Sequence, residues 1–148
     1  MSTRLTIMGA GPGGYTAAFE AAKAGAEVTL VESARMGGTC LNCGCIPTKT
    51  LKSSAEALET IRRAAEFGLG GAGDARVDMP AVVARKRKVI ETLRGGLEKT
   101  CARLKVRLVR GRGRVVDASL VEVALDDGSV ENVPGDKVVI ATGSNTLN

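Results

Sequence analysis

Residues 4–32 carry the sequence RLTIMGAGPGGYTAAFEAAKAGAEVTLVE, in which apolar runs alternate with small residues. The runs at 4–8 and 27–31 are short and apolar, which predicts two buried strands. The segment 15–24 is rich in alanine and other helix-favouring residues, and Gly25 stops it. Strand, glycine turn, helix and strand in this order predict a right-handed βαβ unit with parallel strands.

The remainder of the chain predicts two long helices followed by an antiparallel meander. Apolar residues recur on one face of segments 46–67 and 79–104, as in amphipathic helices. The pattern then changes to period two, and Asp127-Gly128 is a hairpin turn signal. The predicted strands lie at 105–109, 112–117, 119–125, 129–134 and 137–140. We expect one α/β domain over 1–148, incomplete, with a β-meander at 105–134.

The glycine turn Gly9-Ala10-Gly11-Pro12-Gly13-Gly14 matches G-x-G-x-x-G and lies between a predicted strand and a predicted helix. The first glycine permits the turn, the second lets a pyrophosphate approach, and the third lets the helix pack closely on the strand. Glu32 ends the second strand, where a carboxylate can bind an adenosine ribose. The pattern predicts a dinucleotide site, although a ligand-free turn is the alternative, and it does not separate FAD from NAD. The charge of Glu32 disfavours a 2′-phosphate.

Charge and composition exclude several other classes. The net charge is +5, but one tyrosine and two phenylalanines are too few for a base-stacking platform, so we expect no nucleic-acid partner. No apolar run reaches the roughly 18 residues of a membrane span, and the start lacks the features of a signal peptide. We therefore expect a cytoplasmic protein with no membrane partner.

Three cysteines, Cys40, Cys43 and Cys45, lie close together in the sequence. In a reducing compartment, such cysteines are more often catalytic or metal-binding than structural. A metal site with Cys101 as the fourth ligand is one hypothesis. The sequence contains no histidine, and Cys101 falls on the apolar face of a predicted helix, where a free cysteine usually packs. We therefore expect no metal site.

A redox disulfide is the other hypothesis for these cysteines. On a regular helix, Cα atoms five residues apart are roughly 8–9 Å from each other, beyond the limit of about 7 Å for a disulfide. A bridge between Cys40 and Cys45 would therefore require an irregular turn, which Asn42 and Gly44 tolerate. Such a small, strained loop is easily reduced, and the following helix N-terminus is expected to lower the thiol pKa values.

Residues 37–49, GGTCLNCGCIPTK, resemble the redox-disulfide signature of the pyridine nucleotide–disulfide oxidoreductases. Cys43 occupies the one variable position, either as a small apolar substitute or as an alternative thiol partner. The glycine turn, Glu32 and Ala141-Thr142-Gly143 also occur in the order of that family. Within the family the stretch is most similar to dihydrolipoamide dehydrogenases, because mercuric and glutathione reductases tend to have valine at the positions of Leu41 and Ile46.

The resemblance implies a Rossmann-like FAD-binding domain. Lys49 would lie near the flavin N5, and a glycine turn at 110–113 would meet the adenine. The implied FAD-binding residues are Gly9, Gly11, Pro12, Gly13, Gly14, Glu32, Ser33, Gly38, Thr39, Lys49, Gly113, Ala141, Thr142 and Gly143.

The resemblance also implies the activity. Cys40 and Cys45 would be the catalytic disulfide, with Cys45 nearer the flavin and Cys40 exchanging with the substrate. Electrons would pass between NAD(H), bound outside this segment, FAD, the disulfide and a dithiol or disulfide substrate, most similar to a lipoyl group. A mercuric- or glutathione-reductase-like enzyme and a non-catalytic FAD-binding module are the alternatives.

The family's remaining parts are expected outside this segment. Its members form homodimers in which a histidine–glutamate pair of the partner subunit serves as acid and base, and this chain has no histidine. We expect the 148 residues to be a fragment that is inactive alone, with exposed apolar surface at the edge of its sheet.

Overall fold

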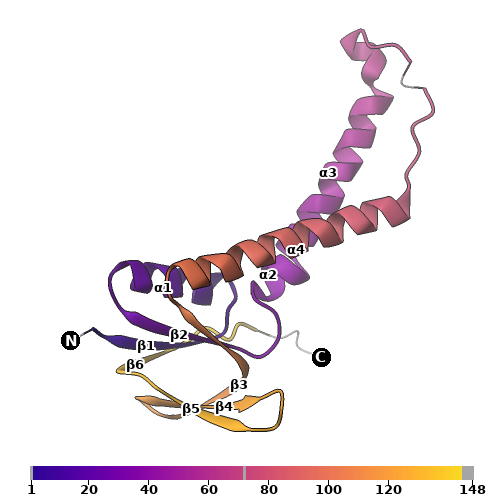
Figure 1. Cartoon of the computed structure of the whole chain (residues 1–148). Helices are drawn as coiled ribbons and strands as arrows, with labels where there is room; N and C mark the ends of the chain where they lie inside the picture. The colour runs from indigo at the N-terminus through magenta and orange to yellow at the C-terminus, as the bar shows by residue number, and fades with distance from the viewer. Residues whose placement is uncertain (1, 72, 145–148) are drawn as a thin grey trace.

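The computed structural model of the chain describes residues 2–71 and 73–144. Six strands form one sheet in the order β5-β4-β3-β2-β1-β6, and helices pack against it (Figure 1). The elements in chain order are β1 (Arg4–Met8), α1 (Pro12–Lys23), β2 (Glu27–Glu32), α2 (Gly38–Asn42), α3 (Cys45–Arg62), the 3₁₀ helix η1 (Ala64–Phe67), α4 (Met79–Arg103), β3 (Arg107–Asp117), β4 (Leu120–Leu125), β5 (Val130–Pro134) and β6 (Lys137–Ile140).

The βαβ unit predicted from the first residues is confirmed. Strands β1 and β2 pair in parallel on either side of α1, and β6 pairs in parallel with β1. Helix α1 begins at Pro12, earlier than the predicted residue 15, because proline suits the first helical position and Gly11 before it is extended. Gly25, at φ +92°, ends the helical segment as predicted.

Strand β3 differs from the prediction, which placed two strands here with a turn at 110–113. One continuous strand runs through these residues. It pairs in parallel with β2 as far as Arg110 and then antiparallel with β4 from Gly111 onward. A Cβ at Gly111 would overlap the carbonyl oxygen of Ala124, so glycine allows this close approach. The chain changes its pairing partner instead of turning. The predicted hairpin between β4 and β5 is confirmed, with Gly128 at φ +86°.

The first long helix is shorter than the predicted 46–67. Helix α3 ends at Arg62, and η1 follows as a separate tight turn. The side chain of Arg63 is paired with Glu66 at 2.7 Å, and Gly68 closes the turn at φ +72°. The predicted apolar face of α3 is also less buried than expected, because Leu51 is 40% exposed and the helix extends away from the sheet (Figure 1). Helix α4 confirms the second predicted helix.

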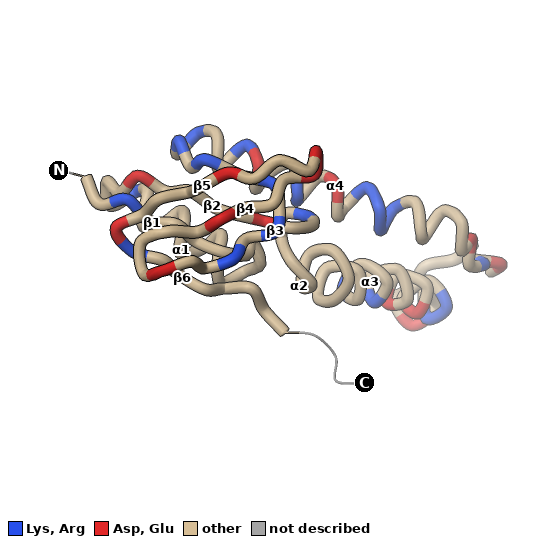
Figure 2. The backbone as a smooth tube through the Cα atoms, turned by 90° about the horizontal axis from the view of Figure 1, so that it is seen from below, with Lys and Arg blue, Asp and Glu red and all other residues tan. Residues whose placement is uncertain are grey.

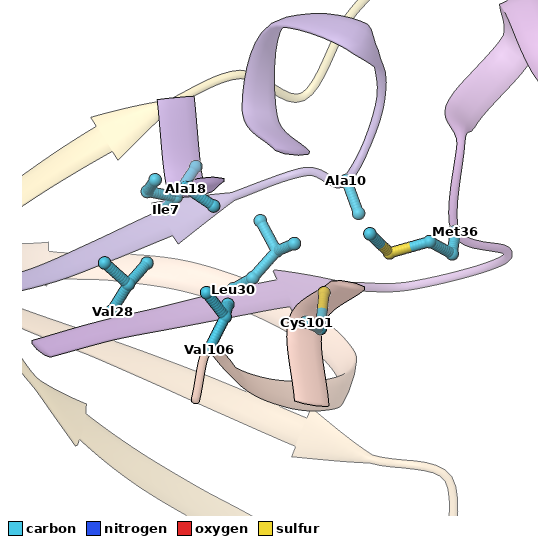
Figure 3. Close-up of a cluster of buried hydrophobic side chains, with 8 residues drawn as sticks. All are labelled: Ile7, Ala10, Ala18, Val28, Leu30, Met36, Cys101 and Val106. Carbon is cyan, nitrogen blue, oxygen red and sulfur yellow. The ribbon is translucent and has the colours of Figure 1, made fainter. Parts of the chain in front are cut away.

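The main core lies between the parallel strands and the helices α1 and α4. Ile7 and Leu30 are fully buried there, beside Ala10, Met36 and Cys101 (Figure 3). Each large apolar side chain buried in this way stabilises the fold by about 1.5–3 kcal/mol. The core therefore fixes the ends of β1 and β2 and the segments that follow them.

A second apolar cluster joins the meander to the sheet and includes Met8, Val31 and Val123. The fold class is the predicted one: an α/β domain with a mostly parallel sheet, two long helices and an antiparallel β3–β5 meander. Ile140, on the edge strand β6, is 67% exposed, in line with the expected apolar surface. None of the helices in the described part of the chain is long and apolar enough to cross a membrane.

Candidate functional site

The glycine turn follows β1 and is closed on two sides by backbone. A Cβ at Gly9, where φ is +96°, would overlap the carbonyl oxygen of Ala141, and a Cβ at Gly14 would overlap that of Gly9. The amide of Ala141 donates to the carbonyl of Met8 at 2.8 Å. The first and last glycines thus have the packing roles predicted for them, and the turn is held between α1 and the residues after β6.

The middle of the turn is open. Nothing lies within 4 Å of a Cβ added at Gly13, whereas the Cβ of a residue at Gly38 would come within 2.7 Å of the Gly11 Cα. The start of α2 therefore covers one side of the turn. The first N–H groups of an α-helix have no intrahelical partner, so the N-terminus of α1 can receive an anion from the open side.

Glu32 lies at the end of β2 next to this turn. Its carboxylate accepts hydrogen bonds from the backbone N–H groups of Ala10 and Ala34, each at 2.7 Å. The two bonds hold the carboxylate in one orientation. Each carboxylate oxygen retains acceptor capacity, so the group can also accept from the hydroxyls of a bound ribose.

Two adjoining cavities run along this edge of the sheet. One, of about 640 Å³, lies between Glu32 and the meander residues 111–113, and the other, of about 390 Å³, extends from Glu32 to Cys40. Both are lined by Gly9, Glu32 and Thr142. Small-molecule sites have volumes in this range. The cavities form an extended path from β3 past the helix N-terminus to the cysteines, which suits a long dinucleotide.

The structure brings most of the predicted cofactor residues to these cavities. Gly14 and Gly38 lie behind the surface as packing residues, and Lys49 is exposed on α3 and lines neither cavity. Those that do line one or both are Gly9, Gly11, Pro12, Gly13, Glu32, Ser33, Thr39, Gly113, Ala141, Thr142 and Gly143. Lining residues that the sequence did not indicate are Met8, Val31, Gly111, Arg112, Ala124, Asp126 and Ser144.

The cysteine loop (residues 37–45) contains the irregular turn that the sequence required. Helix α2 ends at Asn42, and α3 begins at Cys45. A Cβ at Gly44 would be 3.3 Å from the Thr39 carbonyl oxygen and 3.6 Å from the Cys40 Cα. Gly44 therefore folds back against the turn that carries Cys40, and this brings Cys45 to it. The four cysteines are free thiols in this structure.

The thiols of Cys40 and Cys45 are in contact. A hydrogen bond with the Cys45 side chain, followed by partial burial and the charge of Cys45, raises the pKa of the Cys40 thiol. The Cys45 backbone and the positive charge of Lys49 oppose that rise. The expected lowering of the pKa is thus wrong for Cys40, because Cys40 lies within α2 and not at the N-terminus of α3. Cys40 is the proton donor of the pair.

Asn42 holds the cysteine loop in place. Its side-chain amide donates to the carbonyl oxygens of Met36 at 3.1 Å and Gly38 at 2.9 Å. Its Oδ1 accepts from Nη2 of Arg94 on α4 at 2.7 Å. No sequence pattern indicated the contact with Arg94, which lies 52 residues further along the chain. Helix α4 therefore supports the loop through this pair.

The remaining cysteines differ in burial. Cys101 is 3% exposed in the main core, where burial raises the pKa of its thiol, so it packs as the sequence indicated. Cys43 is exposed at the end of α2 and does not pack as an apolar residue would. Among residues 2–71 and 73–144, no group of three histidine, cysteine or acidic residues is placed to hold a metal ion.

Known proteins with similar sequences and structures share these features. The family described as "Pyridine nucleotide-disulphide oxidoreductase" matches residues 3–148. The dihydrolipoyl dehydrogenase of Chlamydia muridarum is 41% identical over 93% of this chain and 29% of its own length, and that of Geobacillus stearothermophilus is 39% identical over 99% and 31%. The crystal structure of LpdA from Mycobacterium tuberculosis matches with a TM-score of 0.86 and 27% identity, over 98% of this chain and 33% of that one. The chain thus spans about three-tenths of the length of these relatives.

Proposed function

The chain belongs to the pyridine nucleotide-disulphide oxidoreductase family, and on this basis we propose that it is the N-terminal part of the FAD-binding domain of a dihydrolipoyl-dehydrogenase-like enzyme. The family uses FAD and NAD(P)H. One observation carries the proposal: the contacting thiols of Cys40 and Cys45 lie at the end of the cavity that runs along the glycine turn.

In this proposal the chain holds FAD along the two cavities. The N-terminus of α1 faces the pyrophosphate, and Glu32 accepts from the ribose while Ala10 and Ala34 keep it oriented. The adenine lies toward β3, near Gly113, and the flavin lies toward Thr39 and Cys40. Bound flavin would supply the two-electron exchange between a nicotinamide and the disulfide.

The thiol chemistry falls to Cys40 and Cys45. With the pair oxidised, a thiolate of a dithiol substrate attacks the Cys40 sulfur, forms a mixed disulfide and releases Cys45 as a thiolate. The second substrate thiolate then attacks the substrate sulfur of the mixed disulfide, which releases Cys40 and the oxidised substrate. The two protons of the substrate pass to a base, which we assign to the rest of the enzyme. The electron pair stays on the two cysteines until it passes to the flavin.

We propose a lipoyl group as the substrate, for two reasons. The relatives that match over 93% and 99% of this chain are named dihydrolipoyl dehydrogenases. A vicinal dithiol such as dihydrolipoamide also supplies both attacking sulfurs from one molecule, so the mixed disulfide resolves within a single complex. The carboxylate of Glu32 favours NAD(H) over its 2′-phosphorylated form only if it also faces the nicotinamide coenzyme, so the proposal takes NAD(H) from the relatives.

The test is turnover by the full chain loaded with FAD. We expect NAD⁺-dependent oxidation of dihydrolipoamide, and little NADPH-dependent reduction of glutathione disulfide. Cys40→Ser should abolish turnover and retain bound flavin, whereas Cys43→Ser should support both. Flavin binding without any disulfide turnover would contradict the proposal and favour a non-catalytic FAD-binding module.

A further inference from the structure

Helix α4 carries four consecutive basic residues, 85–88, which cannot share one face because each is turned by about 100° from the last. Figure 2 shows lysine and arginine recurring along this helix. The sequence predicted a solvated basic face. The structure divides the run instead: Arg85 donates to the Thr50 carbonyl at 2.9 Å and to the Ser54 hydroxyl at 3.2 Å, and so joins α4 to α3. Lys86 and Arg87 face elsewhere.

Lys86, Arg87 and Arg94 line a hollow of about 420 Å³ that Arg35 closes from the segment between β2 and α2. Glu91 is the one acidic residue among its lining residues. Within the described ranges, none of these four basic side chains forms an ion pair. Elsewhere in the same part of the chain, seven basic side chains do have carboxylate partners. The hollow is therefore a place where positive charge gathers without protein counter-charge.

We propose that this hollow binds the phosphate group of a small ligand. Like charges around a concave surface repel one another and concentrate a positive potential in it, and an anion relieves that repulsion. Guanidinium groups match phosphate oxygens as paired donors, and a lysine adds a point charge. The two sides of the hollow come from different segments, since Arg35 follows β2 and the other three lie on α4. A bound phosphate bridges them.

The site adjoins the cysteine loop. Asn42 lines the same hollow, and its Oδ1 already accepts from Arg94 at 2.7 Å. Through its amide, Asn42 holds the carbonyls of Met36 and Gly38 at the start of the loop. A phosphate that binds Arg35 and Arg94 together therefore ties the segment before the loop to α4. We expect it to stabilise the position of the loop without touching the dinucleotide cavities, which share none of the residues of the hollow.

The test measures binding by the full chain, loaded with FAD so that the flavin site is filled. Inorganic phosphate and glycerol phosphate are titrated by calorimetry at constant ionic strength, set with sodium chloride. We expect one saturable site. Lys86→Gln and Arg87→Gln should each weaken binding by about tenfold, since each removes a charged hydrogen bond of about 1.5 kcal/mol. Lys88→Gln, on the same helix and outside the hollow, should leave binding unchanged.

The outcomes separate the possibilities. Binding of phosphate alone identifies a free ion as the ligand, and equal or tighter binding of glycerol phosphate identifies a phosphorylated metabolite. Both support the site. The absence of saturable binding to either probe overturns it, and so does equal weakening by Lys88→Gln, which indicates diffuse charge. Circular dichroism and the flavin spectrum check that each variant is folded. Because no turnover is measured, failure of this site leaves the proposed redox function untouched.

Discussion

The carboxylate of Glu32 accepts a hydrogen bond of 2.7 Å from the backbone N–H of Ala10. This bond links the end of β2 to the glycine turn that follows β1. The sequence indicated Glu32 as a ligand of a ribose, and the structure adds that the same carboxylate also orders the turn. Preorganisation of this kind lowers the entropy that a cofactor must overcome to bind.

Glu32→Ala is therefore expected to weaken FAD binding. The substitution removes a charged acceptor, which costs about 1.5–3 kcal/mol, or one to two orders of magnitude in Kd. Flavin titration of the apoprotein of the full chain measures this effect. Glu27→Ala is the matched control, because Glu27 is exposed at the other end of the same strand. Unchanged flavin affinity in Glu32→Ala would refute the role assigned to this carboxylate.

Gly14 and Gly13 should respond differently to alanine. A Cβ at Gly14 would overlap the Gly9 carbonyl oxygen, which is backbone and has little room to move. We expect Gly14→Ala to lower the free energy of unfolding by more than about 3 kcal/mol. Nothing lies within 4 Å of a Cβ at Gly13, so Gly13→Ala should leave stability unchanged or raise it by up to about 1 kcal/mol.

Chemical unfolding of the two apoproteins, compared with the parent, tests this pair. Gly13→Ala can still weaken FAD binding if the pyrophosphate approaches there, so stability and flavin affinity are measured separately. Equal stability of the two variants would contradict the close packing of α1 on the turn.

The sequence predicted the elements whose partners are close in the chain. Strand β1 was predicted with its observed limits, and β2 to within one residue, because buried strands bounded by glycine turns have a strong local pattern. Gly44 likewise marked the irregular turn of the cysteine loop. In each case the residues that determine the structure lie within a few positions of it.

Features that depend on distant partners were missed. The continuity of β3 requires both β2 and β4 beside it, and neither the period nor the glycines reveal that the strand changes partner at Gly111. The contact between Asn42 and Arg94 joins α4 to the cysteine loop across 52 residues. The predicted lowering of the Cys40 pKa failed for the same reason, since it considered the helix terminus and not the neighbouring thiol.

The third prediction concerns Cys40 and Cys45 as the redox pair. In the oxidised, FAD-loaded full chain, alkylation after denaturation should modify two fewer of the cysteines at positions 40, 43, 45 and 101 than it does after reduction. Cys43→Ser should form the same disulfide, whereas Cys40→Ser and Cys45→Ser should not. Intact-mass measurement gives the number of modified thiols. A disulfide that survives in Cys45→Ser would show that Cys43 replaces Cys45 as the partner.

Asn42→Ala should loosen the cysteine loop. The substitution leaves the carbonyls of Met36 and Gly38 without their donor and removes the acceptor of Arg94, at a cost of about 1–3 kcal/mol in the free energy of unfolding. We also expect slower re-formation of the disulfide after reduction, measured by thiol trapping. Thr92→Ala, an exposed position on α4, is the control. Loss of stability with an unchanged rate of disulfide formation would limit Asn42 to a structural role.

The last prediction is the pH dependence of Cys40 alkylation in the reduced protein. The neighbouring Cys45 thiol is the largest cause of the raised pKa of Cys40, so at pH 8 Cys40 carries less thiolate than an ordinary cysteine and reacts more slowly. Cys45→Ala removes that cause. The pKa should fall toward the ordinary value, and alkylation at pH 8 should become faster. Lys49→Ala removes a charge that lowers the pKa, so it should have the opposite effect and slow the reaction.

Rates are measured by iodoacetamide trapping between pH 7 and 10 in a Cys43→Ser background, in which Cys101 is protected by burial. The position of the rate profile on the pH axis reports the pKa of Cys40 directly. A shift to lower pH in Cys45→Ala and to higher pH in Lys49→Ala would establish that the neighbouring thiol and the lysine act on Cys40 in opposite directions. A profile that does not move in Cys45→Ala would mean that the two thiols are not in contact in solution, and the assignment of Cys40 as proton donor of the pair would fail with it.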